Sequence, residues 1–465
     1  QQMLQEKGYT IVPFDEIADI YIVNTCTVTN IADRKSRQML HRAKQKNPAA
    51  LVVAVGCYVQ TGREEVEQDP CIDLAIGNNR KKDLASILEE YLQDLEQEDA
   101  VAENAENAGQ GVDKTLHDTT VIDINHTAEY EEMTLKHTAE HTRAYIKIQD
   151  GCNQFCSYCV IPYARGRVRS RKAEDIIREI AGMAQAGYRE IVLTGIHISS
   201  YGIDFDEEAW KCGESVSVLK EDEERRDYSG SSKLIDLLER IHDIEGIERI
   251  RIGSLEPRII TEETAARMAA LPKLCPHFHL SLQSGCDATL RRMNRKYTAA
   301  EYAESVALLR KVFDHPAITT DVIVGFPGET EEEFAQTKDF LEQIRFFEMH
   351  IFKYSKRAGT RAAVMPDQVP DPVKTIRSAE LLAMEKEQSK QFRAHYLGQE
   401  AEVLLEETKK IDGTEYLLGH TRDYVKVAVP VAEDGQQRLI NTVVCGRVES
   451  FLNDEILLMP IKDAP

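Results

Sequence analysis

Apolar positions over residues 1–80 alternate between strand-like and helix-like spacing. Short apolar runs at Asp19–Val23, Leu51–Val55 and Ile72–Ile76 are separated by segments that include Ile31–Lys46, where the spacing is helical. Strands that alternate with helices are typical of a parallel sheet covered by helices. We therefore expect a small α/β domain over residues 1–80.

The same alternation returns on a larger scale over residues 141–390. Apolar runs end at glycine or polar residues, and helix-like segments separate them. This pattern predicts a partial or complete β/α barrel, in which the polar strand ends form the active site. The predicted strands are Ala144–Ile148, Glu190–Leu193, Glu248–Ile252, Phe278–Leu282, Thr320–Val324 and Phe347–Phe352.

The pattern changes again near the end of the chain. A polar helical stretch over Pro370–Phe392 is followed, over residues 392–463, by short strand-like runs with turns between them. Such runs predict a small antiparallel β-barrel, a shape that often holds RNA. Aromatic and basic residues interleave there, as in RNA-binding barrels: Tyr416, Arg422, Tyr424, Lys426 and Arg447. The predicted fold class is α/β with a C-terminal β-barrel.

Charge and composition limit the classes of partner. The 465-residue chain has a net charge of −22, concentrated in residues 83–111 and 204–227, which we expect to be solvated and poorly ordered. We interpret residues 81–140 as an acidic linker, and we count His126, His137 and the adjoining His141 as linker residues. Outside these stretches the chain is nearer neutral, so a basic surface for RNA is permitted.

Cysteine usage and hydropathy indicate a reducing compartment and no membrane. No apolar run reaches the ~18 residues that span a bilayer. Ten cysteines in so long a chain do not form a disulfide scaffold, and their clustering favours metal ligation. We therefore expect a cytoplasmic protein.

The strongest chemical signal is the loop from Gly151 to Cys159, which places Cys152, Cys156 and Cys159 in C-x3-C-x2-C spacing. Thiolates suit iron–sulfur clusters and zinc, and three ligands leave one metal position open for chemistry. A zinc loop with a distant fourth ligand, or three unrelated core cysteines, is the alternative.

Two further cysteines follow predicted strands of the N-terminal domain. Cys26 and Cys57 each lie just beyond a strand's C-terminal end, where α/β sheets place ligands. Metal ligands and plain buried thiols are equally consistent with that placement.

Ordered motifs along nearly the whole chain resemble the methylthiotransferase family of radical S-adenosylmethionine (SAM) enzymes. The tail resembles that family's RNA-binding TRAM domain. The motifs are Asn24–Thr29, Val55–Cys57, Gln149–Gly166, Ser281–Gly285, Arg292–Arg295 and Asp321–Thr330.

The resemblance implies two 4Fe–4S clusters and SAM as cofactors. Cys152, Cys156 and Cys159 would hold the cluster that cleaves SAM to a 5′-deoxyadenosyl radical. Cys26 and Cys57 match two ligands of a second, sulfur-supplying cluster, whose third ligand we expect before Gln1, in a segment that this sequence lacks. A chain beginning at Gln1 should still cleave SAM but fail to insert sulfur. The resemblance also places five residues near SAM: Tyr158, Gly195, Ser254, Glu256 and Gln283.

Two strings, Thr194–Ile198 and Gly253–Pro257, resemble the branch of the family that acts on threonylcarbamoyl-adenosine in tRNA. The implied reaction adds a methylthio group to C2 of that base beside the anticodon, and the implied electron donor resembles flavodoxin or ferredoxin. The same chemistry on isopentenyladenosine or on a ribosomal protein is the alternative. A non-catalytic RNA-binding iron–sulfur protein is the alternative of another class.

Overall fold

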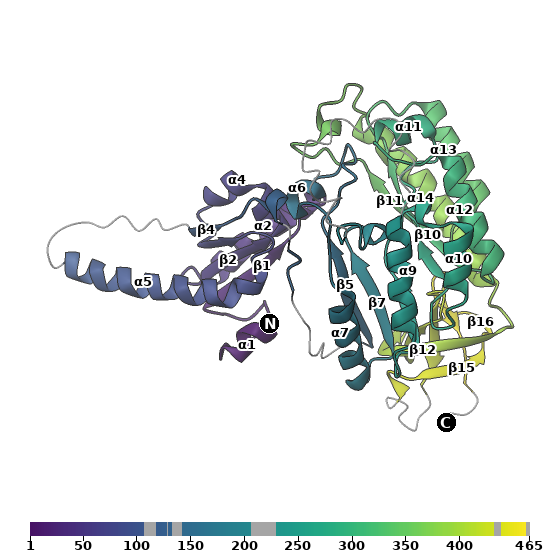
Figure 1. Ribbon diagram of the computed structural model, residues 1–465, viewed down its shortest axis with the longest axis horizontal. Helices are drawn as coiled ribbons and strands as arrows, with labels where there is room; N and C mark the ends of the chain where they lie inside the picture. Colours follow the sequence, from purple (N-terminus) through teal and green to yellow (C-terminus); the bar gives the residue numbers. More distant parts are fainter. Residues whose placement is uncertain (107–117, 128, 133–141, 206–228, 432–438, 462–465) are drawn as a thin grey trace. The chain divides into compact units, whose positions relative to one another are not determined.

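The computed structural model describes residues 1–106, 118–127, 129–132, 142–205, 229–431 and 439–461 (Figure 1). They form two compact units. The first contains the described residues of Gln1–Met133 together with Gly151–Arg167 and Ser355–Ala363, and the second contains the rest. The cysteine loop therefore belongs to the same unit as the N-terminal residues. No helix within the described ranges is both long and apolar enough to cross a membrane.

The first unit is built on a parallel four-stranded sheet with the order β1-β2-β3-β4. Its central strand β2 is buried on both sides. Val52 and Ala54 face the core formed with Leu40, whereas Val53 and Val55 face the core formed with Leu88. The strands are β1 (Ile20–Thr25), β2 (Leu51–Gly56), β3 (Leu74–Ile76) and β4 (Asp118–Thr120).

Helices cover both faces of this sheet (Figure 1). Thr29 caps helix α2 (Asn30–Lys46), because its side chain accepts a hydrogen bond from the Ala32 amide. The helices are α1 (Gln2–Glu6), α2 (Asn30–Lys46), α3 (Cys57–Thr61), α4 (Arg63–Glu67), α5 (Leu84–Glu106) and α6 (Ile161–Arg165).

The expectation of a poorly ordered stretch from residue 83 is wrong for α5, and the interpretation of residues 81–140 as a linker missed β4. Helix α5 packs on the sheet through apolar residues spaced three and four apart: Leu84, Ile87, Leu88, Tyr91, Leu92 and Leu95. That spacing is present in the sequence, where the surrounding acidic residues hid it. His137, His141 and the acidic residues 206–227 lie outside the described ranges.

The second unit contains the barrel strands in two sheets, with orders β6-β5-β7-β8 and β11-β10-β9. Isolated parallel bridges between Ile250 and Leu274 and between Leu255 and Leu280 link the region of β8 to the region of β9. All six predicted barrel strands are confirmed. They are β5 (Arg143–Asp150), β7 (Glu190–Gly195), β8 (Arg249–Ile252), β9 (His277–His279), β10 (Ala317–Val324) and β11 (Glu348–Lys353), and a short β6 (Arg169–Ser170) pairs antiparallel with β5.

Helices follow one another along the outside of these strands, from α7 through α9, α10, α12 and α13 to α14 (Figure 1). Capping boxes at Thr261, Thr298 and Thr330 start three of them. Their bounds are α7 (Ala173–Gln185), α9 (Ser229–His242), α10 (Glu262–Ala269), α11 (Asp287–Arg292), α12 (Ala299–Val312), α13 (Glu331–Ile344) and α14 (Asp371–Ala394).

The C-terminal strands form one curled sheet with the order β15-β12-β13-β14-β17-β16. Pairing is antiparallel except between β14 and β17, which are parallel. Its core includes Val403, Leu405, Leu417, Val427 and Met459. The strands are β12 (Glu400–Ile411), β13 (Thr414–His420), β14 (Lys426–Pro430), β15 (Val443–Arg447), β16 (Ser450–Phe451) and β17 (Leu457–Leu458).

Candidate functional site

The cysteine loop begins directly after β5 at a glycine that tolerates no side chain. Gly151 has φ +73°, and a Cβ atom there would lie 1.8 Å from the carbonyl oxygen of Arg167. The adjacent Cys152 amide donates to the Gly166 carbonyl at 3.0 Å, which closes the loop on itself. Only glycine allows this close approach of two backbone segments.

The three loop cysteines are partly buried and belong to a compact turn. The Cys159 amide donates to the Cys156 carbonyl at 3.0 Å, and the Gln154 amide donates to Cys152 Sγ at 3.5 Å. The Ala362 amide donates to the Ser157 carbonyl at 2.8 Å, so the segment Ser355–Ala363 packs on the loop. Tyr158 lies within the same turn and is partly buried.

Cys26 and Cys57 lie at the C-terminal edge of the N-terminal sheet, as the sequence predicts. Thr25 and Gly56 are the last paired residues of β1 and β2, and each cysteine follows one of them. Cys26 is exposed and Cys57 is buried. The two thiols therefore follow neighbouring strand ends on one edge of one sheet.

Cys57 is surrounded by hydrogen-bond donors from two directions. Arg165, at the end of α6, donates from Nε to Cys57 Sγ at 3.1 Å. Asn78 donates from Nδ2 to the same sulfur at 3.5 Å and to the Ala164 carbonyl at 2.7 Å. A cationic donor and an amide donor on one sulfur form an outer shell of the kind that orients metal ligands.

A buried arginine of the Ser355–Ala363 segment joins that segment to the loop after β1. Arg357 donates to Thr27 Oγ1 and to Asn30 Oδ1, both at 2.6 Å, and pairs with Asp33 at 2.7 Å. Thr27 immediately follows Cys26. The backbone around Cys26 is thereby held by a charged side chain from a distant part of the sequence.

In the second unit, the predicted SAM residues lie at strand ends of the barrel. Gly195 ends β7, and a Cβ atom there would lie 3.1 Å from both Gln149 oxygens. The buried Gln149 side chain accepts a hydrogen bond from the His197 amide at 2.8 Å. Gly195 thus permits a close approach of β7 to the end of β5.

Glu256 follows β8 and is 2% exposed. Its carboxylate lies 3.5 Å from His197 Nε2 and 4.0 Å from the Arg295 guanidinium. The structure therefore brings Glu256 together with the turn that follows Gly195.

Ser254 is exposed, with its hydroxyl 3.3 Å from that of Ser281. Gln283 adopts φ +72°, and its amide donates to the Asp321 carbonyl at 2.8 Å. This left-handed backbone is a local constraint at a strand end, of a kind that clusters at functional sites. Both residues thus lie at strand ends.

Two arginines that follow the cysteine loop have structural roles. Arg169 and Arg171 are nearly fully buried; Arg169 lies 3.6 Å from Asp150, and Arg171 pairs with Glu179. Their charges are thus engaged inside the unit rather than offered to solvent.

Two of the residues that the sequence predicts for RNA contact, Arg422 and Tyr424, also have structural roles. Arg422 donates to the Leu274 carbonyl at 3.1 Å, and the Tyr424 hydroxyl accepts from Arg143 at 2.7 Å. The interleaved spacing predicts an RNA surface, whereas in the structure these two side chains form hydrogen bonds between the C-terminal sheet and the barrel.

Sequence reasoning did not identify Asn78, Arg165 or Arg357 as neighbours of the N-terminal cysteines. Asn78 follows β3, so its position just beyond a strand of a parallel sheet was an available signal. Nothing local in the sequence links Arg357 to Thr27, because the two are 330 positions apart.

The donor set around the cysteine loop fits an iron–sulfur cluster. Three partly buried thiols in a glycine-closed loop supply soft ligands, and the Gln154 amide is aimed at one sulfur. Hydrogen bonds to sulfur tune such clusters. The buried Asn78 Oδ1 has no hydrogen-bond partner among the described residues, which leaves a polar atom beside Cys57 for a bound group.

The fold and the loop define the class as a radical SAM enzyme. The family model described as "Radical SAM superfamily" matches residues 146–341, and the model described as "Uncharacterized protein family UPF0004" matches residues 1–77. The fold is similar to that of the radical SAM methyltransferase TsrM from Kitasatospora setae. The TM-score is 0.50 at 14% identity, over 75% of this chain and 64% of that one.

The chain belongs to the radical SAM methylthiotransferase family. It is 37% identical to the threonylcarbamoyladenosine tRNA methylthiotransferase MtaB of Bacillus subtilis, over 93% of this chain and 87% of that protein. It is also 37% identical to MtaB of Aquifex aeolicus, over 89% of this chain and 90% of that protein. The chain is likewise 37% identical to the tRNA-2-methylthio-N(6)-dimethylallyladenosine synthase of a Thermoanaerobacter species, over 90% of this chain and 81% of that protein. Membership of this family implies a 4Fe–4S cluster and SAM.

Proposed function

We propose that this enzyme adds a methylthio group to C2 of threonylcarbamoyl-adenosine beside the anticodon of tRNA. The observation that carries the proposal is the match at 37% identity to two relatives named for that reaction, along about nine tenths of this chain. The cysteine loop, the strand-end cysteines and the C-terminal sheet supply the parts that such a reaction needs.

Cys152, Cys156 and Cys159 would hold the first 4Fe–4S cluster. When bound, this cluster and SAM supply a 5′-deoxyadenosyl radical. Cys26 and Cys57 would supply two of the ligands of a second cluster that presents sulfur. The protein's own contribution there is to orient the Cys57 sulfur through hydrogen bonds from Arg165 and Asn78, and to hold the Cys26 loop through Arg357.

The SAM contacts fall to the strand ends of the barrel. Gly195 allows backbone to approach the ligand, and the buried Glu256 carboxylate offers an acceptor for its ammonium group. Ser254, Gln283 and, from the cysteine loop, Tyr158 complete the proposed set. Each binds and orients; none of them moves a proton in this scheme.

The proposed RNA surface lies on the C-terminal sheet. Lys409 and Tyr416 are cross-strand partners of β12 and β13, so their side chains share one face. Lys409 is exposed and Tyr416 is partly exposed, which suits contact with phosphate and with a base. The enzyme would further need a flavodoxin-like or ferredoxin-like electron donor, in the reducing cytoplasm.

Nucleoside analysis tests the substrate. Mass spectrometry of tRNA from cells lacking the gene should show loss of the methylthio-threonylcarbamoyl nucleoside and accumulation of its unthiolated precursor. Complementation with the chromosomal gene carrying Cys156→Ala should fail, whereas the same gene carrying the exposed Cys445→Ser control should succeed. Unchanged levels of the methylthio nucleoside in the deletion strain would refute the proposal.

The second candidate substrate is the isopentenyl-type adenosine. The 37% identity to a dimethylallyladenosine synthase favours it as the alternative. The same nucleoside analysis decides, because loss of the methylthio-isopentenyl nucleoside alone would assign that substrate. Release of 5′-deoxyadenosine from SAM under anaerobic reduction separates both from a non-catalytic RNA-binding protein.

A further inference from the structure

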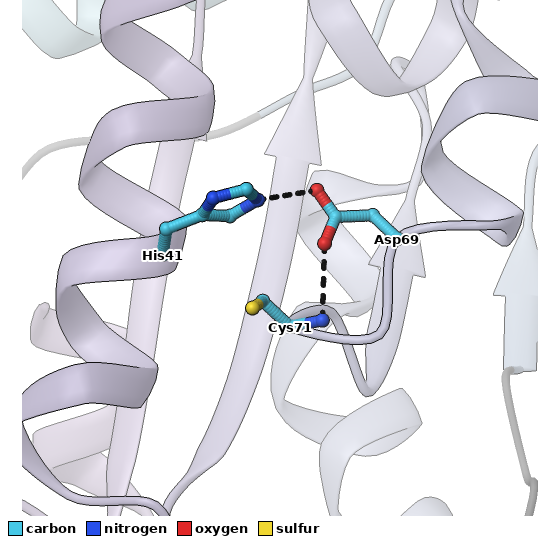
Figure 2. Close-up of side chains that lie close together, drawn as sticks. All are labelled: His41, Asp69 and Cys71. Atoms are coloured by element: carbon cyan, nitrogen blue, oxygen red, sulfur yellow. Dashed lines mark hydrogen bonds and ion pairs between the residues drawn. The ribbon is translucent and has the colours of Figure 1, made fainter.

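Three side chains with different ligand atoms meet on the N-terminal domain, away from the cysteines discussed above. His41 projects from α2, while Asp69 and Cys71 belong to the loop between α4 and β3 (Figure 2). The imidazole, carboxylate and thiol converge on one point between the helix and the loop. Their ligand atoms all lie within 4.8 Å of one another.

Asp69 organises this cluster through both of its carboxylate oxygens. Oδ2 lies 2.8 Å from His41 Nε2, and Oδ1 accepts a hydrogen bond from the Cys71 amide at 3.0 Å (Figure 2). The Asp69 side chain is 11% exposed, whereas that of His41 is 48% exposed. The loop is therefore fixed on the carboxylate, and the imidazole lies at the solvent side.

We infer that His41, Asp69 and Cys71 form a binding site for a divalent transition-metal cation of the zinc type. Nitrogen, oxygen and sulfur donors together match borderline-soft metals, whereas magnesium and calcium select oxygen alone. Three protein ligands leave a fourth position, which faces solvent beside the exposed imidazole. Tetrahedral bonds of ~2.0–2.3 Å need donor atoms roughly 3.4 Å apart, so small side-chain rotations suffice.

Binding of a cation at this site releases a proton and changes no oxidation state. Cys71 would bind a cation through its deprotonated sulfur. A bound cation would form the metal–sulfur bond as the thiol proton leaves to solvent. The neighbouring Lys44 ammonium is already engaged with Asp73 at 2.8 Å and accepts no metal.

The site is topologically separate from Cys26 and Cys57. Those cysteines follow β1 and β2 at the C-terminal edge of the sheet. Cys71 lies just before β3, at the N-terminal edge, and His41 lies in the second half of α2, which returns to that edge. One parallel sheet thus carries a proposed cluster at one edge and a mononuclear site at the other.

The test measures zinc and iron together in the cluster-loaded protein. Wild type and a Cys71→Ser variant are incubated with micromolar Zn²⁺ and then passed through gel filtration. Wild type should retain one more zinc per chain than the variant, and the iron content should be the same in both. His41→Gln, at an exposed position, should weaken zinc binding ~10-fold or more without affecting folding. Cys445→Ser, the control for loss of an exposed thiol, should bind zinc as wild type does.

Co²⁺ substitution gives the second readout. The difference spectrum between wild type and Cys71→Ser should show a thiolate-to-cobalt charge-transfer band that His41→Gln diminishes and Cys445→Ser retains. Zinc retention by Cys71→Ser equal to wild type would overturn the assignment. So would loss of iron in Cys71→Ser, because Cys71 would then belong to a cluster.

Discussion

Arg165 donates a hydrogen bond from Nε to Cys57 Sγ at 3.1 Å. It joins the helix that follows the cysteine loop to a cysteine at the edge of the N-terminal sheet. Second-sphere donors of this kind tune ligand basicity and cluster retention.

Replacing Arg165 with Gln should therefore weaken the proposed second cluster selectively. Loss of an outer-sphere partner costs ~10–100-fold in metal affinity. We expect less iron per chain and a lower ratio of methylthiolated product to 5′-deoxyadenosine, with SAM cleavage retained. Arg63→Gln, which removes an exposed arginine paired with Glu67, is the control. Equal iron content in both variants would contradict this role.

The buried pair of Arg377 and Glu329 should be essential to stability. Arg377 donates to Glu329 Oε2 at 2.6 Å, and the Gly325 amide donates to the same oxygen at 2.6 Å. Arg377→Met leaves a buried carboxylate without its cation, which costs ~3–5 kcal/mol. Chemical denaturation should show this loss, and adding Glu329→Gln should recover much of it. Lys338→Met, at an exposed pair, should change the free energy of unfolding little.

The Arg377→Met deficit should also depend on pH. Burial raises the pKa of Glu329 above its ordinary value even with Arg377 present. A raised folded-state pKa means that protonation favours the folded state, so stability is lost as pH rises through that pKa. The variant's deficit should accordingly shrink as pH falls and Glu329 becomes neutral. A deficit that stays constant with pH would indicate lost packing rather than an unpaired charge.

Glu406 should make the second unit sensitive to acid. Burial alone would raise the pKa of Glu406, but the hydrogen bond and charge of His420, together with Arg143, lower it from 4.5 to about 2. A lowered folded-state pKa contributes stability that is present above 4.5 and is lost as pH falls from 4.5 to about 2. That difference corresponds to about 3 kcal/mol.

Glu406→Gln should flatten the stability profile in that window. Arg143 keeps a second partner in the variant, because its Nε lies 3.1 Å from Glu190. Urea unfolding between pH 5 and pH 3 compares the two proteins, with the exposed Glu415→Gln as control. A variant that loses stability as steeply as wild type would show that other carboxylates dominate acid unfolding.

How much the sequence predicts depends on the range over which each signal acts. The six barrel strands and the strand-end position of Cys57 follow from local patterns and are confirmed. Tyr424 shows the limit of such patterns. Its place among basic residues predicted RNA contact, yet its ring lies against Arg143 and Arg251, at 4.9 and 4.8 Å. Contacts between residues so distant in sequence leave no periodic signal.

The last prediction concerns Glu256 as a SAM contact. The carboxylate is 2% exposed at the end of β8, so a ligand ammonium would meet it in a poorly solvated environment. A hydrogen bond to a charged group there is worth ~1.5–3 kcal/mol, or roughly 10–150-fold in affinity. Glu256→Gln keeps the shape and removes the charge, so calorimetry on cluster-loaded protein should show SAM binding weakened by about that factor. The exposed Glu245→Gln is the control.

A thermal melt of each variant separates binding from folding. Glu256 also lies near His197 and Arg295, so a purely structural role would lower the melting temperature and leave the SAM affinity of the folded protein unchanged. Weakened binding with a nearly unchanged melting temperature would assign the carboxylate to the ligand. Unchanged affinity would remove Glu256 from the proposed SAM set and leave Gly195, Ser254, Gln283 and Tyr158 to be tested in turn.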